Sequence, residues 1–444
     1  MDNLKLLRYN TGTDKQVFIK FKDDVSAVIF NATIVAYSSS AVADLVSVYK
    51  NQYIIDPQTH IFQHDIEAIQ TIDKKGVPVI KKSVLQYMDQ LPLGLKERYM
   101  SKSGNLSTDD IAPYIDELVD KVYLFETEYV DRYIEKKEYD KYLKFVNLGP
   151  RPKLVVAPYF MLKERYLNDS IDSWMNLNKK IAEKFIKRNS SNYETAIQLV
   201  LEKKVLEVAN ISDLIKNSYN GINVDYAFVW IDDYNGFLAT EKQQVNFKKI
   251  LQTFNEIGIK PIMSYGGYDA ILLCHPELSY RLYGVAQSVG YGETRNITPV
   301  GGGLPVNKYY FPPLHSRLNM SNVIAILQQQ GFLSMDKKLA SEKFFDTICA
   351  CKQCKIIIKN NFDNFMLFNE SVPFKVRGTI SRNRPTTDAT LIAAVHFMHS
   401  KMQEWDGVET KSYNQLIDEL LSAYNTYSKN DYNTIKKWCS IYEK

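Results

Sequence analysis

The sequence predicts a mixed α/β fold, a (β/α)8 TIM barrel followed by a zinc-binding helical subdomain. Short runs of β-branched or aromatic residues alternate with helical patterns, which is typical of βα units that build a parallel sheet. Eight such runs occur within the first 289 residues, and eight strands are what a closed barrel of this kind needs. Beyond residue 289 the alternation ends and a cysteine cluster follows. We therefore predict a catalytic barrel domain over residues 1–315 and the subdomain over residues 316–444.

The predicted elements follow one another along the chain as strand and crossover helix. The strands are expected at residues 26–35, 52–62, 121–127, 153–160, 195–201, 224–231, 260–265 and 283–289. Helical patterns between them include residues 41–50, 170–187, 211–217, 240–257 and 268–282. Residues 290–313 are rich in glycine and proline, so we expect an irregular segment with short strands there. The last elements are a strand at 355–359 and helices at 322–329, 387–405 and from 412 to the end.

Composition is that of a globular protein in solution. Apolar residues make up 45% and charged residues 24% of the 444 residues, which excludes collagen-like, coiled-coil and wholly disordered chains. No stretch approaches the roughly 20 apolar residues of a membrane helix, and residues 1–10 lack the apolar run of a signal peptide. We expect a cytoplasmic protein that does not enter a membrane. The net charge of +4 leaves a nucleic-acid partner open, because it is compatible with a local basic groove.

Three of the five cysteines form a metal-binding pattern. Cys349, Cys351 and Cys354 have the spacing C-x-C-x-x-C, and three thiolates this close together can bind one tetrahedral Zn²⁺. The fourth ligand must come from elsewhere, and His396 and His399 in a predicted helix are the candidates. Because four protein ligands leave no open coordination position, we predict one structural zinc ion per chain.

Carboxylates follow several of the predicted strands. Asp56, Asp232, Asp233 and Glu293 come shortly after apolar runs, and barrels of this kind carry their chemistry at the carboxyl ends of the strands. One carboxylate can attack a sugar carbon while another moves a proton on the leaving group. Asp232 and Asp233 are adjacent and point in different directions, so at most one is expected to face a substrate. A metal-dependent hydrolase is a less favoured alternative, because His60 is the only histidine close to these positions.

Other residues at the strand ends are suited to binding a nucleotide. Tyrosines can stack on a base, an arginine can hold a phosphate, and a pair of glycines lets a flat ring approach the backbone. These candidates are Tyr265, Tyr268, Tyr291, Arg295, Gly266 and Gly267.

The order of these features resembles the tRNA-guanine transglycosylase superfamily, in which a TIM barrel precedes a zinc subdomain. The likeness covers about residues 20–405. Cys349, Cys351 and Cys354 match the family's thiol triplet, and AAVHFMHSKMQEW resembles its ligand helix. The resemblance therefore implies His396 as the fourth zinc ligand. The interval before His396 is longer than is usual in the family, which implies an insertion around residues 360–385 and keeps His399 as an alternative ligand.

In the barrel, YIIDPQTHIF resembles the family's strand that ends in a catalytic aspartate. The resemblance implies that Asp56 lies over the base, with Gln58 and His60 as neighbouring substrate-binding residues. Pro57 and Gln58 replace the usual Ser-Gly pair, so the contacts to the base must differ. Glu202 stands where the family has a base-reading glutamine, and is a further substrate-binding candidate.

The last predicted strand departs from the family at one position. GVAQSVGYGETR resembles the family's last barrel strand, and Thr294 and Arg295 match its Thr-Arg pair. The family's covalent nucleophile, an aspartate, would fall at Val289. Either the nucleophile has moved, or the protein binds nucleic acid without exchanging bases. We favour relocation, with Asp232, Asp233 and Glu293 as candidates.

The resemblance implies a transglycosylase that exchanges guanine for a 7-deazaguanine base, such as preQ0, in a polynucleotide. Where the sequence departs from the tRNA enzymes, it looks more like the DNA-guanine transglycosylases. DNA is therefore favoured over tRNA as the partner. We expect a carboxylate, Asp56 or Asp232, to attack C1′ of a flipped nucleotide while the other one transfers protons. Whether accessory proteins unwind the DNA or deliver it to the enzyme is an open question. The alternative is a noncatalytic nucleic-acid-binding subunit on the same fold.

Overall fold

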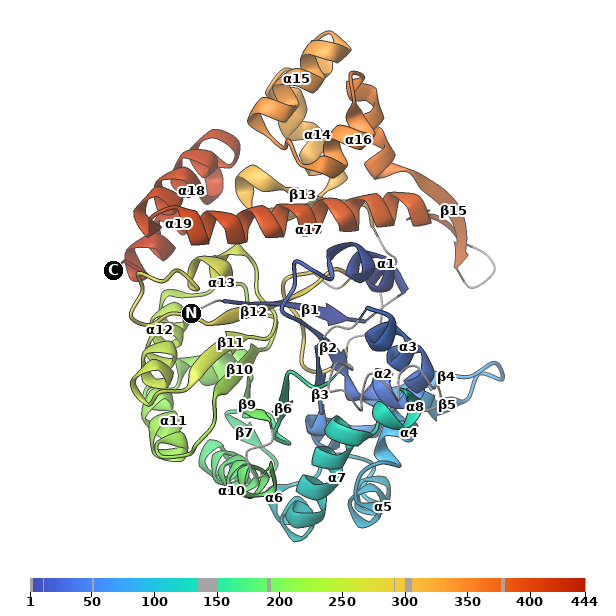
Figure 1. The fold of residues 1–444 in the computed structure, drawn as a ribbon, viewed down its shortest axis with the longest axis vertical. Coiled ribbons are helices and arrows are strands. Elements are labelled where there is room, and N and C mark those ends of the chain that lie inside the picture. Colours follow the sequence, from blue (N-terminus) through green and yellow to red (C-terminus); the bar gives the residue numbers. More distant parts are fainter. Residues whose placement is uncertain are drawn as a thin grey trace.

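An eight-stranded parallel sheet forms the centre of the molecule. The computed structural model describes residues 3–10, 12–49, 52–134, 151–189, 193–290, 292–299, 306–376 and 380–443. The strand order is β3-β2-β1-β12-β11-β10-β9-β6. Their bounds are β1 (Leu4–Tyr9), β2 (Ala27–Asn31), β3 (Tyr53–Asp56), β6 (Leu154–Val156), β9 (Glu194–Leu201), β10 (Tyr226–Ile231), β11 (Lys260–Met263) and β12 (Gly284–Ser288). A parallel bridge from Tyr53 to Pro152 joins the two edges, so the sheet is a nearly closed barrel, consistent with a TIM barrel (Figure 1).

Apolar side chains fill the inside of this barrel. Successive residues of a strand point to opposite faces of the sheet, so alternate side chains point inward. The inward-facing cluster is Leu6, Ala27, Ile29, Ile54, Leu154, Val156, Ala196, Tyr226, Phe228, Ile262 and Ala286. Intervening residues such as Leu7 and Val285 belong to the larger core under the helices. Gly284 allows β1 and β12 to approach closely, since a Cβ there would lie 2.6 Å from the carbonyl oxygen of Leu4.

Helices cover the outside of the barrel. Those that follow the strands are α1 (Gly12–Phe21), α2 (Ala32–Tyr37), α3 (Ser39–Tyr49), α7 (Ile115–Glu128), α10 (Ile171–Asn189), α11 (Ile211–Tyr219), α12 (Glu241–Glu256) and α13 (Tyr268–Leu272). Smaller elements between β3 and α10 are β4 (Gln70–Ile72), β5 (Pro78–Ile80), α4 (Lys82–Met88), α5 (Leu93–Ser101), α6 (Thr108–Ile111), α8 (Asp131–Ile134), β7 (Arg165–Tyr166) and β8 (Asp169–Ser170). Short 3-10 helices include Thr59–Gln63, Ile66–Ile69, Ala112–Tyr114 and Lys203–Glu207. Thr240 and Gln243 form a capping box that satisfies backbone donors at the start of α12.

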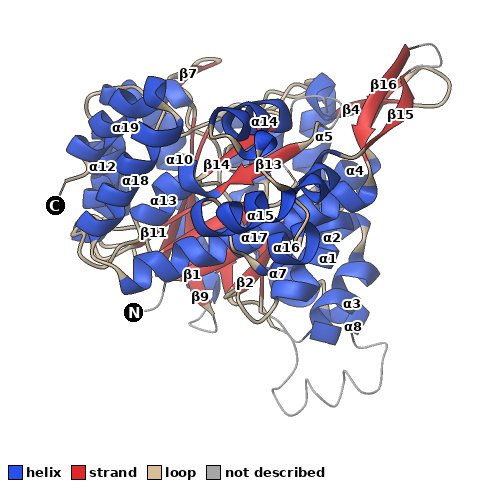
Figure 2. Ribbon diagram, turned by 90° about the horizontal axis from the view of Figure 1, so that it is seen from above, coloured by secondary structure: helices blue, strands red, loops and turns tan. Residues whose placement is uncertain are grey.

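The chain after β12 builds a helical layer and then returns to the barrel. Its elements are β13 (Lys308–Phe311), β14 (Ser316–Asn319), α14 (Met320–Gln329), α15 (Lys337–Thr347), α16 (Lys352–Ile358), β15 (Ser371–Val376), β16 (Ile380–Pro385), α17 (Thr387–Thr410), α18 (Tyr413–Tyr427) and α19 (Lys429–Ile441), with 3-10 helices at Pro312–Leu314, Phe332–Ser334 and Phe362–Asn369. Helix α17 packs against both α1 and α13, the position of the eighth barrel helix, and α14, α15 and α16 lie on its far side (Figure 1). The hairpin of β15 and β16 projects from the molecule (Figure 2).

One predicted strand is wrong, and one strand was not predicted. Residues 121–127 belong to α7, because their buried side chains continue the helical spacing that begins at Leu118 and Val119. The remaining barrel strand is β1, which lies between β2 and β12. Its charged residues Lys5 and Arg8 interrupt the apolar run, so the segment does not have the composition of a buried strand.

Two further element predictions are wrong in the C-terminal half of the barrel and beyond it. Residues 355–358 are the end of α16 rather than a strand, because the helix starts from an N-cap at Cys351, whose Sγ accepts from the backbone N–H of Cys354. The helix expected over 268–282 ends at Leu272. The boundary expected between residues 315 and 316 falls inside the β13–β14 hairpin, and the two-domain division stays a prediction. Among the described residues, no helix combines the length and apolarity needed to span a bilayer.

Truncating a side chain inside the barrel should destabilise the whole fold. Phe228 is 1% exposed, and its strand neighbours are Gln198 and Ile262, so Phe228→Ala leaves a cavity that costs about 3–5 kcal/mol. Urea unfolding followed by circular dichroism measures this loss. The control is Leu238→Ala, at a side chain that is 68% exposed, which should change the unfolding free energy by less than about 0.5 kcal/mol. Equal losses in the two variants would contradict the packing described here.

Candidate functional site

A buried ion pair occupies the carboxyl-terminal mouth of the barrel. The guanidinium of Arg8 on β1 lies 2.9 Å from Oδ2 of Asp56 at the end of β3, and the two side chains are 1% and 2% exposed. Oδ1 of Asp56 accepts hydrogen bonds from the Tyr159 hydroxyl at 2.7 Å and from the Gln58 backbone N–H at 3.2 Å. Arg8 also donates from Nε to the carbonyl oxygen of Ser264 at 2.9 Å. Both oxygens of the Asp56 carboxylate are therefore hydrogen-bonded.

Neighbouring groups determine the protonation states of Arg8 and Tyr159. Burial acts to lower the pKa of Arg8, but the nearby Tyr265, Asp56 and Tyr159 outweigh it and raise that pKa above its ordinary value. Burial, and then the Asp56 carboxylate, raise the pKa of Tyr159 well above the usual range. Arg8 therefore stays a cation and Tyr159 stays a phenol that donates its proton to Asp56. The guanidinium also lies over the ring of Tyr265, 4.3 Å from its centroid, a cation–π contact.

Aromatic side chains close the mouth above the ion pair. His60 stacks on Tyr159 with 5.3 Å between ring centroids and meets Trp230 edge-on at 5.4 Å. Trp230 in turn contacts Tyr265 at 5.0 Å. The buried apolar cluster at this level is Tyr159, Met161, Val200, Trp230, Tyr265 and Ile297. Burial, followed by the charge of Arg8, lowers the pKa of His60 to about 3, so this imidazole is neutral at physiological pH.

Asp232 and Asp233 hold the segment of residues 292–299 over the mouth. Oδ1 of Asp232 accepts from the backbone N–H of Ile297 at 2.7 Å, and Oδ1 of Asp233 accepts from the Thr294 hydroxyl at 2.8 Å. The carbonyl oxygen of Arg295 accepts from the indole N–H of Trp230 at 3.1 Å and from the backbone N–H of Asp233 at 3.1 Å. The two adjacent aspartates thus serve as anchors for one covering segment in this structure.

Glu293 points away from the barrel mouth and toward α17. One of its carboxylate oxygens lies 2.5 Å from Nζ of Lys401, a side chain with no exposed surface. Lys401 is also paired with Glu404 at 2.9 Å and donates to the Tyr310 hydroxyl at 2.7 Å. Glu404 contacts Nδ1 of His315 at 2.7 Å. A buried lysine stays charged only when it is well paired, and here the two carboxylates outweigh burial and raise its pKa.

A pocket of about 210 Å³ lies beside Glu293. Its walls include Asp269 and Tyr268, and the Tyr268 ring stacks on His315 with 3.5 Å between centroids. Oδ2 of Asp269 accepts from the backbone N–H of Gly236 at 2.9 Å. Burial, and then the charge of Glu293, raise the pKa of Asp269 to about 6. Two carboxyl groups therefore share this pocket, and the one of Asp269 keeps its proton to a higher pH than an exposed aspartate does.

The sequence-predicted residues fall into three places rather than one ring. Asp56, Gln58, His60 and Tyr265 lie together at the mouth, and Asp232 and Asp233 lie with Arg295 in the covering segment. Glu293, Gly267 and Tyr268 line the 210 Å³ pocket. Each group has its own partners: Asp56 pairs with Arg8, Asp232 accepts from the backbone of Ile297, and Glu293 pairs with Lys401. Tyr291 lies outside the described residues.

Gly266 has a simpler structural explanation than substrate binding, and for Glu202 the structure gives the position of its backbone. A Cβ at Gly266 would lie 2.5 Å from Cβ of Ala270, so packing of the turn into α13 already requires a glycine there. Glu202 directly precedes the short helix Lys203–Glu207 and donates its backbone N–H to the Leu162 carbonyl oxygen at 2.9 Å.

Four residues of these clusters were not predicted from the sequence. Arg8, Tyr159 and Lys401 are fully buried polar side chains, and Asp269 is 7% exposed. For Arg8 a signal existed, because it is two residues beyond the inward-facing Leu6 on an alternating strand and so points into the barrel. Asp269 belongs to the strand-end motif SYGGYD. Nothing local distinguishes Tyr159, since its partner Asp56 is distant in the chain. Lys401 has a local partner in Glu404, but its other carboxylate, Glu293, comes from a distant segment.

A second cluster has the donors of a metal centre. The ligand atoms of Cys349, Cys351, Cys354 and His396 all lie within 4.8 Å of one another, and all four residues are buried. Nδ1 of His396 is 3.9 Å from Sγ of Cys349 and 3.4 Å from Sγ of each of the other two cysteines. Three thiols and one imidazole are the ligand set of structural zinc sites, so these residues fit that ion.

The surroundings orient the histidine of this cluster. Nε2 of His396 lies 2.7 Å from the carbonyl oxygen of Tyr310, so its proton is placed there and Nδ1 is free to bind a metal. The Tyr309 ring stacks on His396 at 4.2 Å, and its hydroxyl lies 3.2 Å from Sγ of Cys354. His399, the alternative fourth ligand, instead packs edge-on against Phe21 at 4.8 Å. The cluster therefore uses His396.

Comparisons with known proteins add little to this geometry. No protein-family model matches the chain, and no curated protein matches it. Among solved structures, the chain is similar to a mutant protein in complex with xylotriose, with 10% identity and a TM-score of 0.30 over 66% of this chain and 90% of the other. A likeness this weak carries no argument about function.

The raised pKa of Asp269 makes stability depend on pH. The native carboxyl holds its proton up to about pH 6, whereas its ordinary pKa is 3.8. Its favourable contribution is therefore complete below about pH 3.8 and lost as the pH rises through 6, a difference of at most about 3 kcal/mol. Asp269→Asn removes this loss, so the variant should gain stability relative to the native protein between pH 5 and pH 8 in urea titrations.

The control for this experiment is Asp346→Asn, at an exposed aspartate outside the pocket. Its stability relative to the native protein should stay constant over the same pH range. A relative stability of Asp269→Asn that is independent of pH would contradict the buried environment described for this carboxyl group.

Proposed function

We propose that this protein is a guanine transglycosylase that exchanges guanine for a 7-deazaguanine base such as preQ0 in a polynucleotide, with DNA favoured over tRNA. The observation that carries the proposal is the Cys₃His cluster beside a nearly closed parallel barrel. Barrel, thiol triplet and histidine helix follow one another in the order that the transglycosylase superfamily shares. An aspartate at the end of β3 supports the same assignment.

Asp56 is the proposed nucleophile, because it is the carboxylate at the centre of the mouth. One oxygen attacks C1′ of the flipped nucleotide, the C1′–N9 bond breaks, and its electron pair leaves with guanine, which takes up a proton. The glycosyl ester then reacts with a nitrogen of the incoming base, which loses a proton as the carboxylate is released. Arg8, 2.9 Å from Asp56, balances the charge that appears and disappears on this carboxylate.

Asp232 is the proposed proton carrier for both bases. It is half-buried at the end of β10, next to Trp230. Entry of a base requires residues 292–299 to move, which releases Asp232 from the backbone of Ile297 and opens the space over Trp230 and Tyr265. These two rings would then stack on the base, and Arg295 would contact phosphate. Residues 292–299 would thus have a closed state over the mouth and an open state that admits the base.

A noncatalytic nucleic-acid-binding subunit is the second candidate function. The specific observation in its favour is that both oxygens of Asp56 are already hydrogen-bonded, to Arg8 on one side and to Tyr159 and Gln58 on the other. A metal-dependent hydrolase has no comparable support. In the described part of the chain, the Cys₃His cluster is the only group of three or more metal-binding side chains found.

Base-exchange assays decide between these candidates. Labelled guanine or preQ0 is incubated with DNA or tRNA, and label in the polymer is counted. Asp56→Asn should lower incorporation about 10³-fold or more, and Asp232→Asn should lower it less, because the nucleophile is absent only in the first variant. Asp346→Asn is the exposed control, and circular dichroism verifies that each variant is folded. Incorporation that needs neither Asp56 nor Asp232 would overturn the assigned roles, and binding without any incorporation would favour the noncatalytic subunit.

We also propose that the metal of the Cys₃His cluster is one structural zinc ion. The four buried donors leave no position for a substrate, so the ion would bind α17 to the segment that carries the thiols and would supply no chemistry to the reaction. The ion would link His396 of α17 to Cys349, Cys351 and Cys354 at the start of α16.

Metal analysis tests the zinc proposal. The native protein should contain about one zinc ion per chain, and Cys351→Ser should lose most of it and unfold at a lower temperature, because one of four ligands is missing. Cys439→Ser makes the same change at a buried cysteine outside the cluster and should keep the metal. Full zinc content in Cys351→Ser, measured by plasma mass spectrometry, would refute the assignment.

A further inference from the structure

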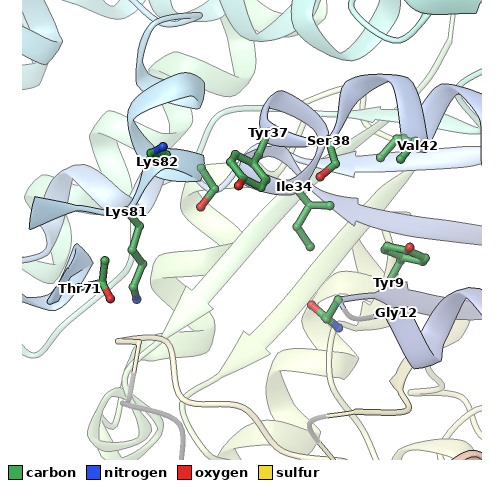
Figure 3. Close-up of a pocket in the computed structure, with 12 residues that line it drawn as sticks. Tyr9, Gly12, Ile34, Tyr37, Ser38, Val42, Thr71, Lys81 and Lys82 are labelled. Atoms are coloured by element: carbon green, nitrogen blue, oxygen red, sulfur yellow. The ribbon is translucent and has the colours of Figure 1, made fainter. Parts of the chain in front are cut away.

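A pocket of about 640 Å³ lies at the carboxyl ends of β1 and β2. Its walls come from the end of β1 and the residues after it, from α2 and α3, and from β4, Lys81 and the start of α4. Figure 3 shows Lys81 and Thr71 on one side of this pocket, with Tyr37 and Ile34 between them and Tyr9. The volume is within the range of pockets that hold small organic ligands.

The charge of this pocket suits an anion. Lys81 is half-buried and Lys82 is exposed, and both line the pocket, whereas no acidic side chain does so in the described part of the chain. No ion pair of either lysine is found among the described residues. Two ammonium groups without a carboxylate create a local positive potential, and lysine is a common point-charge partner of phosphate.

The remaining lining suits a nucleobase. Tyr37 is 55% exposed, so its ring is accessible to a flat ligand in the pocket. Tyr9 packs against Phe30 at 5.2 Å and is half-buried, so its ring is held in place. Aromatic faces of this kind stack on any base, and ammonium groups beside them neutralise the phosphates that link the bases.

Hydrogen bonds connect the pocket to the ion pair at the barrel mouth. Asn10 lines the pocket and accepts from the side-chain amide of Asn31 at 3.1 Å. Oδ1 of Asn31 in turn accepts from Arg8 at 3.5 Å, and Arg8 is paired with Asp56. A nucleotide in the pocket would therefore lie next to one whose sugar is at Asp56.

From this geometry we infer that the pocket binds a neighbouring nucleotide of the same polynucleotide, with Lys81 and Lys82 on its phosphate and Tyr37 on its base. The inference rests on the proposed function, because it takes the reacting nucleotide to be at Asp56. It adds a substrate-binding surface on β1, α2, α3 and α4 that is separate from the Cys₃His cluster and from the base site.

Binding of a labelled single strand tests the inference. Fluorescence anisotropy is measured over a series of salt concentrations with single-stranded DNA of about 12 nucleotides, a length within the site sizes of domains that bind single strands. The double variant Lys81→Ala, Lys82→Ala should bind about tenfold more weakly, and the slope of log K against log salt should fall by about 1.4, or 0.7 for each lost phosphate contact. Tyr37→Ala should weaken binding with the slope unchanged.

The matched control is Lys74→Ala, Lys75→Ala. It removes the same two charges from the exposed turn between β4 and β5, outside the pocket, and should leave affinity and slope close to those of the native protein. Equal effects of the two double variants would overturn the inference, because only total charge would then matter. Binding of dGMP as tight as that of the oligonucleotide, lost in the pocket variant, would also overturn it in favour of a free nucleotide.

The same variants separate this inference from the proposed function. If the pocket variants bind DNA like the native protein while base exchange is present, the inference fails and the transglycosylase stands. If DNA binding depends on the pocket but neither DNA nor tRNA exchanges a base, the transglycosylase fails and the binding surface stands.

Discussion

The position of α17 against the barrel is the constraint on which the rest of the structure depends. This helix packs on α1 and α13 and completes the ring of helices, although the segment before it belongs to another layer. Two interactions fix it. His396 joins it to the thiol cluster, and Lys401 pairs with Glu293 from the end of β12. Because a buried charge is costly unless it is fully paired, the second interaction sets the register of α17 along the barrel.

Much of the fold was predictable because its signals are local. Seven of the barrel strands have the composition of buried strands, and the thiol spacing is visible within six residues of sequence. The exceptions follow from interactions across the molecule. β1 contains Arg8, whose charge is acceptable inside the barrel only because Asp56 lies opposite. Residues 121–127 resemble a strand only in a window too short to show the helical spacing of α7.

The candidate site was predictable in its residue types and not in its assembly. Carboxylates do follow the strands, but the sequence does not reveal which of them are already engaged. Asp232 and Asp233 hold residues 292–299, and Glu293 pairs with Lys401 from more than 100 residues away. The pairing with Arg8 and Tyr159 that keeps Asp56 in the mouth also occupies both of its carboxylate oxygens, so in the proposed reaction stability and reactivity would compete at this side chain.

The late arrival of α17 in the sequence affects how the protein is made. The last barrel strand ends at Ser288, but the helix that covers its junction with β1 begins only at Thr387. On the ribosome, the eight strands emerge well before this cover, and apolar residues such as Leu7 and Val285 face solvent meanwhile. Contacts between such distant segments form slowly and expose the nascent chain to aggregation. A chaperone that holds the incomplete barrel would therefore increase the yield of native protein.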